Sequence, residues 1–240
     1  MPDDLFDDPR FARLYDPLDP DRSDLDAYAE MVREFGAHTV LDLGCGTGTF
    51  ACLLAEQGFE VIGVDPAAAS LDIARAKPHA DAVRWIHGDA TRLPQLDADL
   101  AVMTGNVAQV FLTDAEWDAA LNGIHAALRP GGRLVFETRD PQKRAWQNWT
   151  RENTFIDTIV DGVGRVRTWD DLLEVAPPLV TFESIVILPD GEQLRSTSTL
   201  CFRDREEVEA SLARTGFSVQ EVRDAPDRPG REFVFVATAD

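Results

Sequence analysis

The chain has 240 residues, enough for one large domain or for a domain that carries an insertion. Its hydrophobic fraction of 44% and charged fraction of 28% are those of a folded globular protein, and no apolar run approaches the ~20 residues that span a bilayer. The 43 acidic and 23 basic residues give a net charge of -20, which argues against nucleic acid or an anionic membrane as a partner.

The first 23 residues are acidic, and we expect them to form a leader or lid. They contain neither the basic n-region nor the apolar h-region of a signal peptide. The three cysteines, Cys45, Cys52 and Cys201, have no paired spacing, which favours a reducing compartment and a cytoplasmic protein. The four histidines lack metal-ligand spacing, so we expect no metal site.

Apolar runs alternate with segments of helical spacing between residues 23 and 138. The predicted strands are 39–43, 60–64, 83–87, 100–103 and 133–138, and the predicted helices are 23–35, 49–57, 67–77 and 113–128. Thr113 and Glu116 have the spacing of a capping box at the start of the last helix. This alternation predicts βαβ units and a parallel sheet.

The pattern changes at about Pro141. Four strand-like segments, 154–160, 165–175, 179–188 and 193–202, follow one another without a helix, and a hairpin signal lies at 189–191. A helix that begins at Asp204 and two strands, 217–222 and 233–237, complete the chain. Residues 141–202 are therefore predicted to be an antiparallel β insertion, either a substrate lid or a dimer contact, within a single domain of residues 1–240.

Three glycines follow the first predicted strand and precede a helix. Gly44, Gly46 and Gly48 let the backbone approach a ligand closely, and the helix N-terminus supplies free N–H groups. Asp65 ends the next strand, where a carboxylate can accept hydrogen bonds from both hydroxyls of a ribose. A dinucleotide site has a similar outline, but its G-x-G-x-x-G/A fingerprint would need glycine or alanine at Thr49.

The glycine spacing, preceded by Asp42, resembles the motif of the class I S-adenosylmethionine (SAM)-dependent methyltransferases. The likeness extends from about Asp24 to the end of the chain, and the segments 61–66, 88–90 and 128–134 resemble further motifs of the family in the same order. It implies an α/β, Rossmann-like fold: a seven-stranded, mostly parallel sheet flanked by helices, with the antiparallel insertion after the fifth strand. It also implies SAM as the cofactor and S-adenosylhomocysteine as the product.

The resemblance also implies a set of cofactor-binding residues. Asp65 would bind the ribose, Asp89 the adenine amino group, and the Ala90 N–H a ring nitrogen, while the Thr104 carbonyl would lie near the methionyl amine. The full set is Tyr15, Asp42, Gly44, Cys45, Gly46, Gly48, Asp65, Pro66, Asp89, Ala90, Thr104 and Asn106.

Two members of this set have an alternative interpretation. Asn106 lies either at the edge of the reaction centre or in a turn that tolerates unusual backbone angles. Tyr15 either folds over the methionine end of the cofactor or anchors the leader.

Residues near the end of the fifth predicted strand are candidates for the substrate site. Arg139 and Trp146 are the substrate-binding candidates, although tryptophans in this region commonly pack a lid onto its domain. Tyr15, His87 and Asp140 are candidates for a general base, which is needed only if the nucleophile starts protonated.

The expected function is in-line transfer of a methyl group to a nitrogen or oxygen of a small molecule. The motifs that follow the fourth strand in DNA methyltransferases are absent, as is an acidic cluster for magnesium. Two alternatives stay open: a non-catalytic SAM-binding sensor or partner, and an NAD-dependent oxidoreductase. We expect a monomer or a homodimer.

Overall fold

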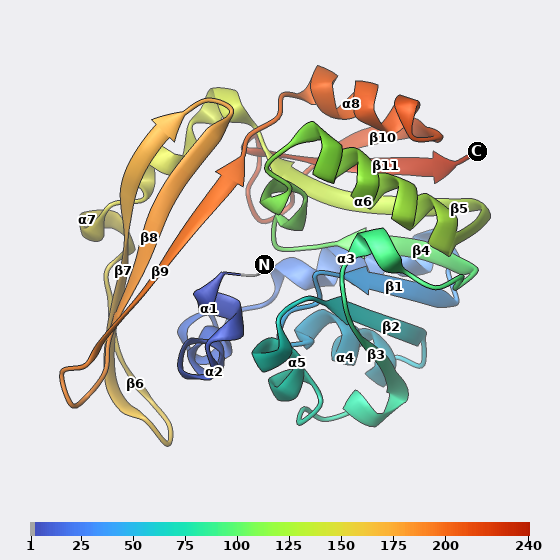
Figure 1. Ribbon diagram of the computed structural model, residues 1–240. Coiled ribbons are helices and arrows are strands. Elements are labelled where there is room, and N and C mark those ends of the chain that lie inside the picture. The colour runs from blue at the N-terminus through green and yellow to red at the C-terminus, as the bar shows by residue number, and fades with distance from the viewer. Residues whose placement is uncertain (1–2) are drawn as a thin grey trace.

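A computed structural model describes residues 3–240 (Figure 1). Met1 and Pro2, the first two residues of the expected leader, lie outside the described residues. The strands form two separate sheets: a seven-stranded sheet of order β10-β11-β5-β4-β1-β2-β3 and a four-stranded sheet of order β6-β7-β8-β9. We call the second one the lid sheet.

From residue 24 onward the helices and strands follow the predicted order, apart from one short additional helix, 151–154, before the lid sheet. The α-helices are α1 (Asp4–Asp7), α2 (Pro9–Leu18), α3 (Asp24–Glu34), α4 (Thr49–Glu56), α5 (Ala68–Ala74), α6 (Asp114–Ala127), α7 (Arg151–Thr154) and α8 (Arg205–Arg214). The strands of the large sheet are β1 (Thr39–Leu43), β2 (Glu60–Asp65), β3 (Val83–His87), β4 (Ala98–Met103), β5 (Leu128–Arg139), β10 (Phe217–Asp224) and β11 (Glu232–Ala239). Those of the lid sheet are β6 (Ile156–Val160), β7 (Gly164–Ala176), β8 (Leu179–Ile187) and β9 (Gln193–Cys201).

The large sheet is mostly parallel, as predicted. β1 pairs with β2 on one side and with β4 on the other, and β3 and β5 extend the parallel sheet outward. Only β11, between β5 and β10, runs antiparallel to its neighbours. The chain order reverses between β1 and β4, so the carboxyl ends of these two strands mark the edge at which open α/β sheets bind ligands.

Helices cover both faces of the large sheet. On one face, Trp117 and Leu121 of α6 and Leu212 of α8 are fully buried against the sheet, and on the other face Val32 of α3 and Leu54 of α4 are fully buried. Full burial of one such side chain contributes about 1.5–3 kcal/mol. These contacts hold the carboxyl ends of the strands in fixed positions.

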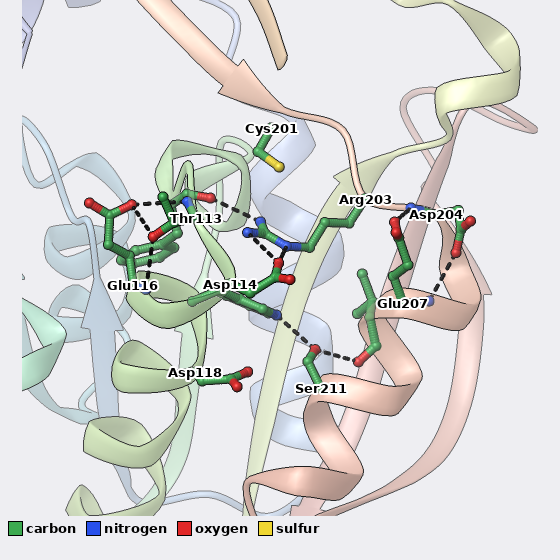
Figure 2. Close-up of polar contacts among 12 residues, drawn as sticks. Thr113, Asp114, Glu116, Asp118, Cys201, Arg203, Asp204, Glu207 and Ser211 are labelled. Atoms are coloured by element: carbon green, nitrogen blue, oxygen red, sulfur yellow. Dashed lines mark hydrogen bonds and ion pairs between the residues drawn. The ribbon is translucent and has the colours of Figure 1, made fainter. Parts of the chain in front are cut away.

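The chain leaves the lid sheet through a polar junction, shown in Figure 2. Arg203 is buried and donates a hydrogen bond to the carbonyl of Phe111 at 2.9 Å. The Trp117 indole N–H donates to Ser211 Oγ at 2.8 Å and so joins α6 to α8. Capping boxes begin both helices, Thr113 with Glu116 as predicted and Asp204 with Glu207. The junction therefore fixes the last strand of the lid sheet to the large sheet's helices.

The lid sheet has one covered face and one exposed face. The covered face consists of the alternate residues Val166, Thr168, Asp170 and Leu172 of β7, Val180, Phe182, Ser184 and Val186 of β8, and Leu194, Ser196, Ser198 and Leu200 of β9. The exposed face presents Ile159, which is 80% exposed, although Trp169 and Ile185, which lie opposite each other on this face, are buried. The insertion predicted after the fifth strand is confirmed as a separate antiparallel sheet.

The leader is helical in α1 and α2, which the sequence analysis did not predict. The Asp8 carboxylate accepts the Arg10 N–H at 2.8 Å, and Pro9 occupies the first helical position, where its missing N–H costs nothing. Phe11 and Leu14 are buried in one cluster with residues of the lid sheet. Two segments far apart in the sequence therefore pack together beside the large sheet.

Candidate functional site

The glycine turn lies at the carboxyl end of β1. Gly44, Gly46 and Gly48 have positive φ angles of 69°, 51° and 76°, which side chains rarely adopt. A Cβ atom on Gly48 would lie 2.6 Å from the Trp85 ring, whereas no atom of the described residues lies within 4 Å of a Cβ placed on Gly46. The turn is thus packed on one side and open on the other, as a backbone that receives a ligand needs to be.

Asp65 joins the glycine turn to the end of β2. Its carboxylate accepts the Gly46 N–H at 2.7 Å and the Ala67 N–H at 2.8 Å, one with each oxygen. Burial raises the pKa of Asp65, and these two hydrogen bonds oppose that rise. A carboxylate has about four acceptor positions, so both oxygens can still accept a ligand hydroxyl.

Asp42 is buried in β1 just before the turn. Neither of its carboxylate oxygens has a hydrogen-bond partner within the described residues. Burial, with the nearby Asp65 charge, raises the pKa of Asp42 to about 7. A buried acid without a partner is costly, so this position is suited to a ligand that supplies positive charge or donors.

Asp89 and Ala90 follow β3. The Asp89 carboxylate accepts hydrogen bonds from the Thr91 hydroxyl and, at 2.8 Å, from the Thr91 N–H. These two hydrogen bonds lower the pKa of Asp89. Asp89 itself is exposed and Ala90 is buried. Both therefore lie at the sheet edge on the β2–β3 side of the glycine turn.

A second group of polar residues lies at the ends of β4 and β5. Asn106, with φ of 63°, donates its N–H to Glu137 Oε1 at 2.6 Å, and both residues are buried. Asn106 Oδ1 and Glu137 Oε2 have no partner within the described residues, and burial raises the pKa of Glu137 to about 7. Thr104 lies directly before this turn and is half-buried. The sequence analysis missed Glu137, although a carboxylate inside an apolar strand is a signal that could have identified it.

The leader reaches this edge through Tyr15. The Tyr15 ring lies 5.8 Å from that of Phe6, and the Tyr15 hydroxyl is within electrostatic reach of Arg22 and Arg139. Burial raises the pKa of Tyr15, so its hydroxyl stays protonated. Arg22, which the sequence analysis did not single out, is also within electrostatic reach of Asp42.

A polar latch fastens the leader to the glycine turn. Asp16, next to Tyr15, accepts the Thr47 hydroxyl at 2.7 Å and lies 2.7 Å from Lys77 Nζ. Lys77 also donates to Thr49 Oγ1 at 2.6 Å. The latch therefore joins α2, the glycine turn and the chain after α5.

The remaining candidates are spread along the edge. His87 is exposed, and its Nε2 lies 3.0 Å from the Pro66 carbonyl. Asp140 accepts the Gln142 N–H at 2.9 Å at the start of a short 3-10 helix. Trp146 is buried with its ring 4.6 Å from that of Phe202. The side chains of His87, Asp140 and Trp146 make no hydrogen bond or ion pair with the glycine turn among the described residues.

Arg139 lies at the carboxyl end of β5 and is already engaged. Its Nη1 donates to Gln109 Oε1 at 2.9 Å, and its Nε is 3.6 Å from Glu232. Its guanidinium lies 5.8 Å from the Trp149 ring centre, and burial lowers its pKa.

Other kinds of site receive no support in the part of the chain that the structure describes. Within residues 3–240 no three His, Cys, Asp or Glu side chains converge as metal ligands. No helix there is long and apolar enough to cross a membrane. A surface groove of about 460 Å³ lies between α2 and α5, but none of the predicted site residues lines it.

Residues 40–132 match the model of a methyltransferase domain family. The chain is 35% identical over 160 residues to the ubiquinone/menaquinone biosynthesis C-methyltransferase UbiE of Rubrivivax gelatinosus, covering 65% of this chain and 58% of that protein. The chain thus spans little more than half the length of UbiE, and it spans 24% of the biotin biosynthesis bifunctional protein BioHC of Cellvibrio japonicus, to which it is 35% identical over 125 residues.

Solved structures share the fold over nearly the whole chain. Streptomyces venezuelae DesVI has a TM-score of 0.77 and 21% identity, covering 95% of this chain and 98% of that one. SAM-bound CalS10, an amino pentose methyltransferase from Micromonospora echinaspora, has a TM-score of 0.71 and 24% identity, with 90% of each chain covered. The central region of the chain therefore matches a methyltransferase domain in sequence, and nearly the whole chain shares its fold with SAM-dependent methyltransferases of known structure.

Proposed function

We propose that this protein transfers the methyl group of SAM to a nitrogen or oxygen nucleophile of a small molecule. The observation that carries the proposal is the open glycine turn. Asp65 holds this turn by accepting the Gly46 N–H, and the unpartnered carboxylate of Asp42 lies in the strand just before it. A ribose hydroxyl pair suits Asp65, and the cationic methionine end of SAM suits the two buried carboxylates Asp42 and Glu137.

The two parts of SAM, adenosine and methionine, would bind to different halves of the sheet edge. Asp65, Asp89 and Ala90, at the ends of β2 and β3, would hold the adenosine part. Asp42 and the Thr104 carbonyl, at the ends of β1 and β4, would hold the methionine part. When bound, SAM supplies a sulfonium methyl that the nucleophile takes by in-line displacement, while the nucleophile's proton passes to a base or to water.

Alignment of the two reactants is the main task left to the protein. Holding them in line can supply up to ~7–11 kcal/mol without a catalytic side chain. Tyr15 and Asn106 are proposed to orient the reacting groups, and because burial raises the pKa of Tyr15, its hydroxyl would act as a donor rather than as a base. Among the base candidates, Asp140 lies on β5's side of the edge, whereas β1 and β2 separate His87 from β4.

The acceptor is proposed to be a small molecule. The net charge of -20 opposes nucleic acid, and CalS10, which shares the fold, is described as acting on an amino pentose. UbiE is described as a C-methyltransferase, so the relatives alone do not select the accepting atom. The free thiols of Cys45, Cys52 and Cys201 support a reducing, cytoplasmic setting.

Incubation of a metabolite extract with methyl-labelled SAM tests the proposal. We expect label in at least one small-molecule product, formed only when the protein is present. SAM binding without label in any product would instead support the second candidate, a SAM-binding sensor. The glycine turn and Asp65 favour this candidate as much as they favour the enzyme, because they indicate cofactor binding and not turnover. Binding of NAD without binding of SAM would overturn both.

A further inference from the structure

The covered face of the lid sheet carries a polar row within a mostly apolar surface. Asp170, Ser184 and Ser196 lie directly opposite one another on β7, β8 and β9, and Ser184 Oγ donates to Asp170 Oδ1 at 2.6 Å. Ser196 Oγ accepts the Leu5 N–H of α1 at 2.8 Å. Ser198, the next residue of β9 on this face, is 3% exposed, and its hydroxyl has no partner within the described residues.

Ser198 lies between the leader and the turn after β4. Ser196 binds α1 on one side of it, and on the other side Gln109 Nε2 donates to the carbonyl of Cys201 at 3.4 Å. Gln109 belongs to the short 3-10 helix Val107–Val110, which packs against β9 and begins directly after Asn106. Asn106 Oδ1 is itself unpartnered. β9 and this 3-10 helix therefore pack together, and a buried oxygen without a partner lies on or next to each: Ser198 Oγ on β9 and Asn106 Oδ1 directly before the helix.

Aromatic rings connect this row to the end of β5. Phe182 lies directly opposite Ser198, and its ring is 4.6 Å from that of Trp149. Trp149 in turn lies 5.8 Å from the Arg139 guanidinium. Ring faces beside a few polar groups are typical of small-molecule sites, since the rings supply contact area and the polar groups fix orientation.

The charges on this surface favour a ligand that donates hydrogen bonds. Asp170 on this face and Glu137 near the end of β5 are both carboxylates, whereas Arg139 at the end of β5 is engaged by Gln109 and Glu232. Because Arg139 already has these partners, an anionic ligand would be repelled by the two carboxylates without compensation from Arg139, whereas a protonated amine would be attracted by them.

We propose that the covered face of the lid sheet binds the methyl acceptor, that Ser198 and Asp170 hydrogen-bond to its polar groups, and that this acceptor is a small amine. The proposal rests on the proposed function and adds the substrate class and its binding residues. It makes Ser198 a specificity-determining residue.

Two panels tested with methyl-labelled SAM address the substrate class: one of small primary and secondary amines, the other of carboxylates and phosphate esters. We expect labelled product in the amine panel. Product only in the acid panel, or in neither panel, would overturn the amine assignment.

Variants then test the surface with the labelled amine as the probe. We expect Ser198→Ala and Asp170→Asn each to raise the KM for the amine about 3- to 10-fold, and to weaken its calorimetric binding to the S-adenosylhomocysteine complex by the same factor. Thr197→Ala, on the exposed face of the same strand, is the matched control. Equal amine binding in Ser198→Ala, Asp170→Asn and the control would overturn this inference while leaving the proposed function intact. Failure of the wild-type protein to bind SAM would instead overturn the proposed function.

Discussion

The edge of the large sheet and the covered face of the lid sheet place polar groups by different means. At the sheet edge, the polar groups come from two βα units that are adjacent in the chain: β1 and the glycine turn belong to the first, and Asp65 belongs to the second. Backbone N–H groups hold the Asp65 carboxylate. On the lid sheet, Asp170, Ser184 and Ser196 come from three strands and meet only through strand register. On our proposals, the first region binds the constant cofactor and the second binds the acceptor, so single substitutions on the lid sheet should change specificity without changing the cofactor site.

Gly48→Ala should cause the largest loss of stability, because it adds a Cβ atom on the packed side of the glycine turn. The new Cβ would lie 2.6 Å from the Trp85 ring and 2.7 Å from Ala74 Cβ, at a residue with a φ of 76°. Overpacking and the left-handed backbone together cost roughly 2–5 kcal/mol, and we expect Tm to fall by roughly 4–20 °C. Thermal unfolding followed by circular dichroism measures the change.

Gly46→Ala is the matched control for that substitution. It carries the same backbone strain but meets no atom of the described residues within 4 Å. Its Tm should fall clearly less, while SAM binding weakens because the Cβ projects into the open side of the turn. Equal loss of Tm in the two variants would contradict the distinction between a packed and an open side.

The pH dependence of stability tests the burial of Asp42. Its folded pKa of about 7 lies above the ordinary value of 3.8, so the folded chain keeps a proton that the unfolded chain has lost. This group's contribution to the free energy of unfolding is therefore fully present below pH ~4 and is lost as pH rises to about 7, by roughly 2–4 kcal/mol.

Urea unfolding of the wild type and Asp42→Asn, measured from pH 4 to pH 8 without ligand, checks this expectation. Because Asn does not titrate, the stability of the wild type relative to the variant should decline over that range. A constant difference would show that Asp42 is ionised throughout and is not the unpartnered acid described above.

Asp16→Asn tests the polar latch between the leader and the glycine turn. Loss of the charged contact to Lys77 should cost about 1–2 kcal/mol, so we expect faster amide exchange in α2 and SAM dissociation roughly 5- to 30-fold faster. Asp72→Asn, which removes an exposed ion pair with Arg75 on α5, is the control. Unchanged exchange and dissociation would mean that the other contacts of α2, with the lid sheet, α1 and α5, hold it without the latch.

Sequence reasoning performed differently in the two regions for a physical reason. The glycine turn, Asp42 and Asp65 are local in the chain, so their spacing predicted where they would lie. Glu137 stands out locally as a carboxylate inside an apolar strand, but its contact with Asn106 is distant in sequence. Ser198 becomes a candidate only through distant neighbours, the leader and the 3-10 helix. Strand segments 154–202 were predicted within about two residues, but which face is covered depends on α1 and α2. The sequence analysis did not predict those helices, because the prolines and acidic residues of the leader are typical of a loop.

Calorimetric titration of SAM into the wild-type protein and Asp65→Ala tests the central claim most directly. Asp65 both accepts the Gly46 N–H and faces the proposed ribose, so its removal should weaken binding by about 1–3 kcal/mol, or roughly 5- to 150-fold, while the wild type binds SAM and not NAD. Unchanged SAM affinity in Asp65→Ala would contradict the assignment of the glycine turn as the cofactor site.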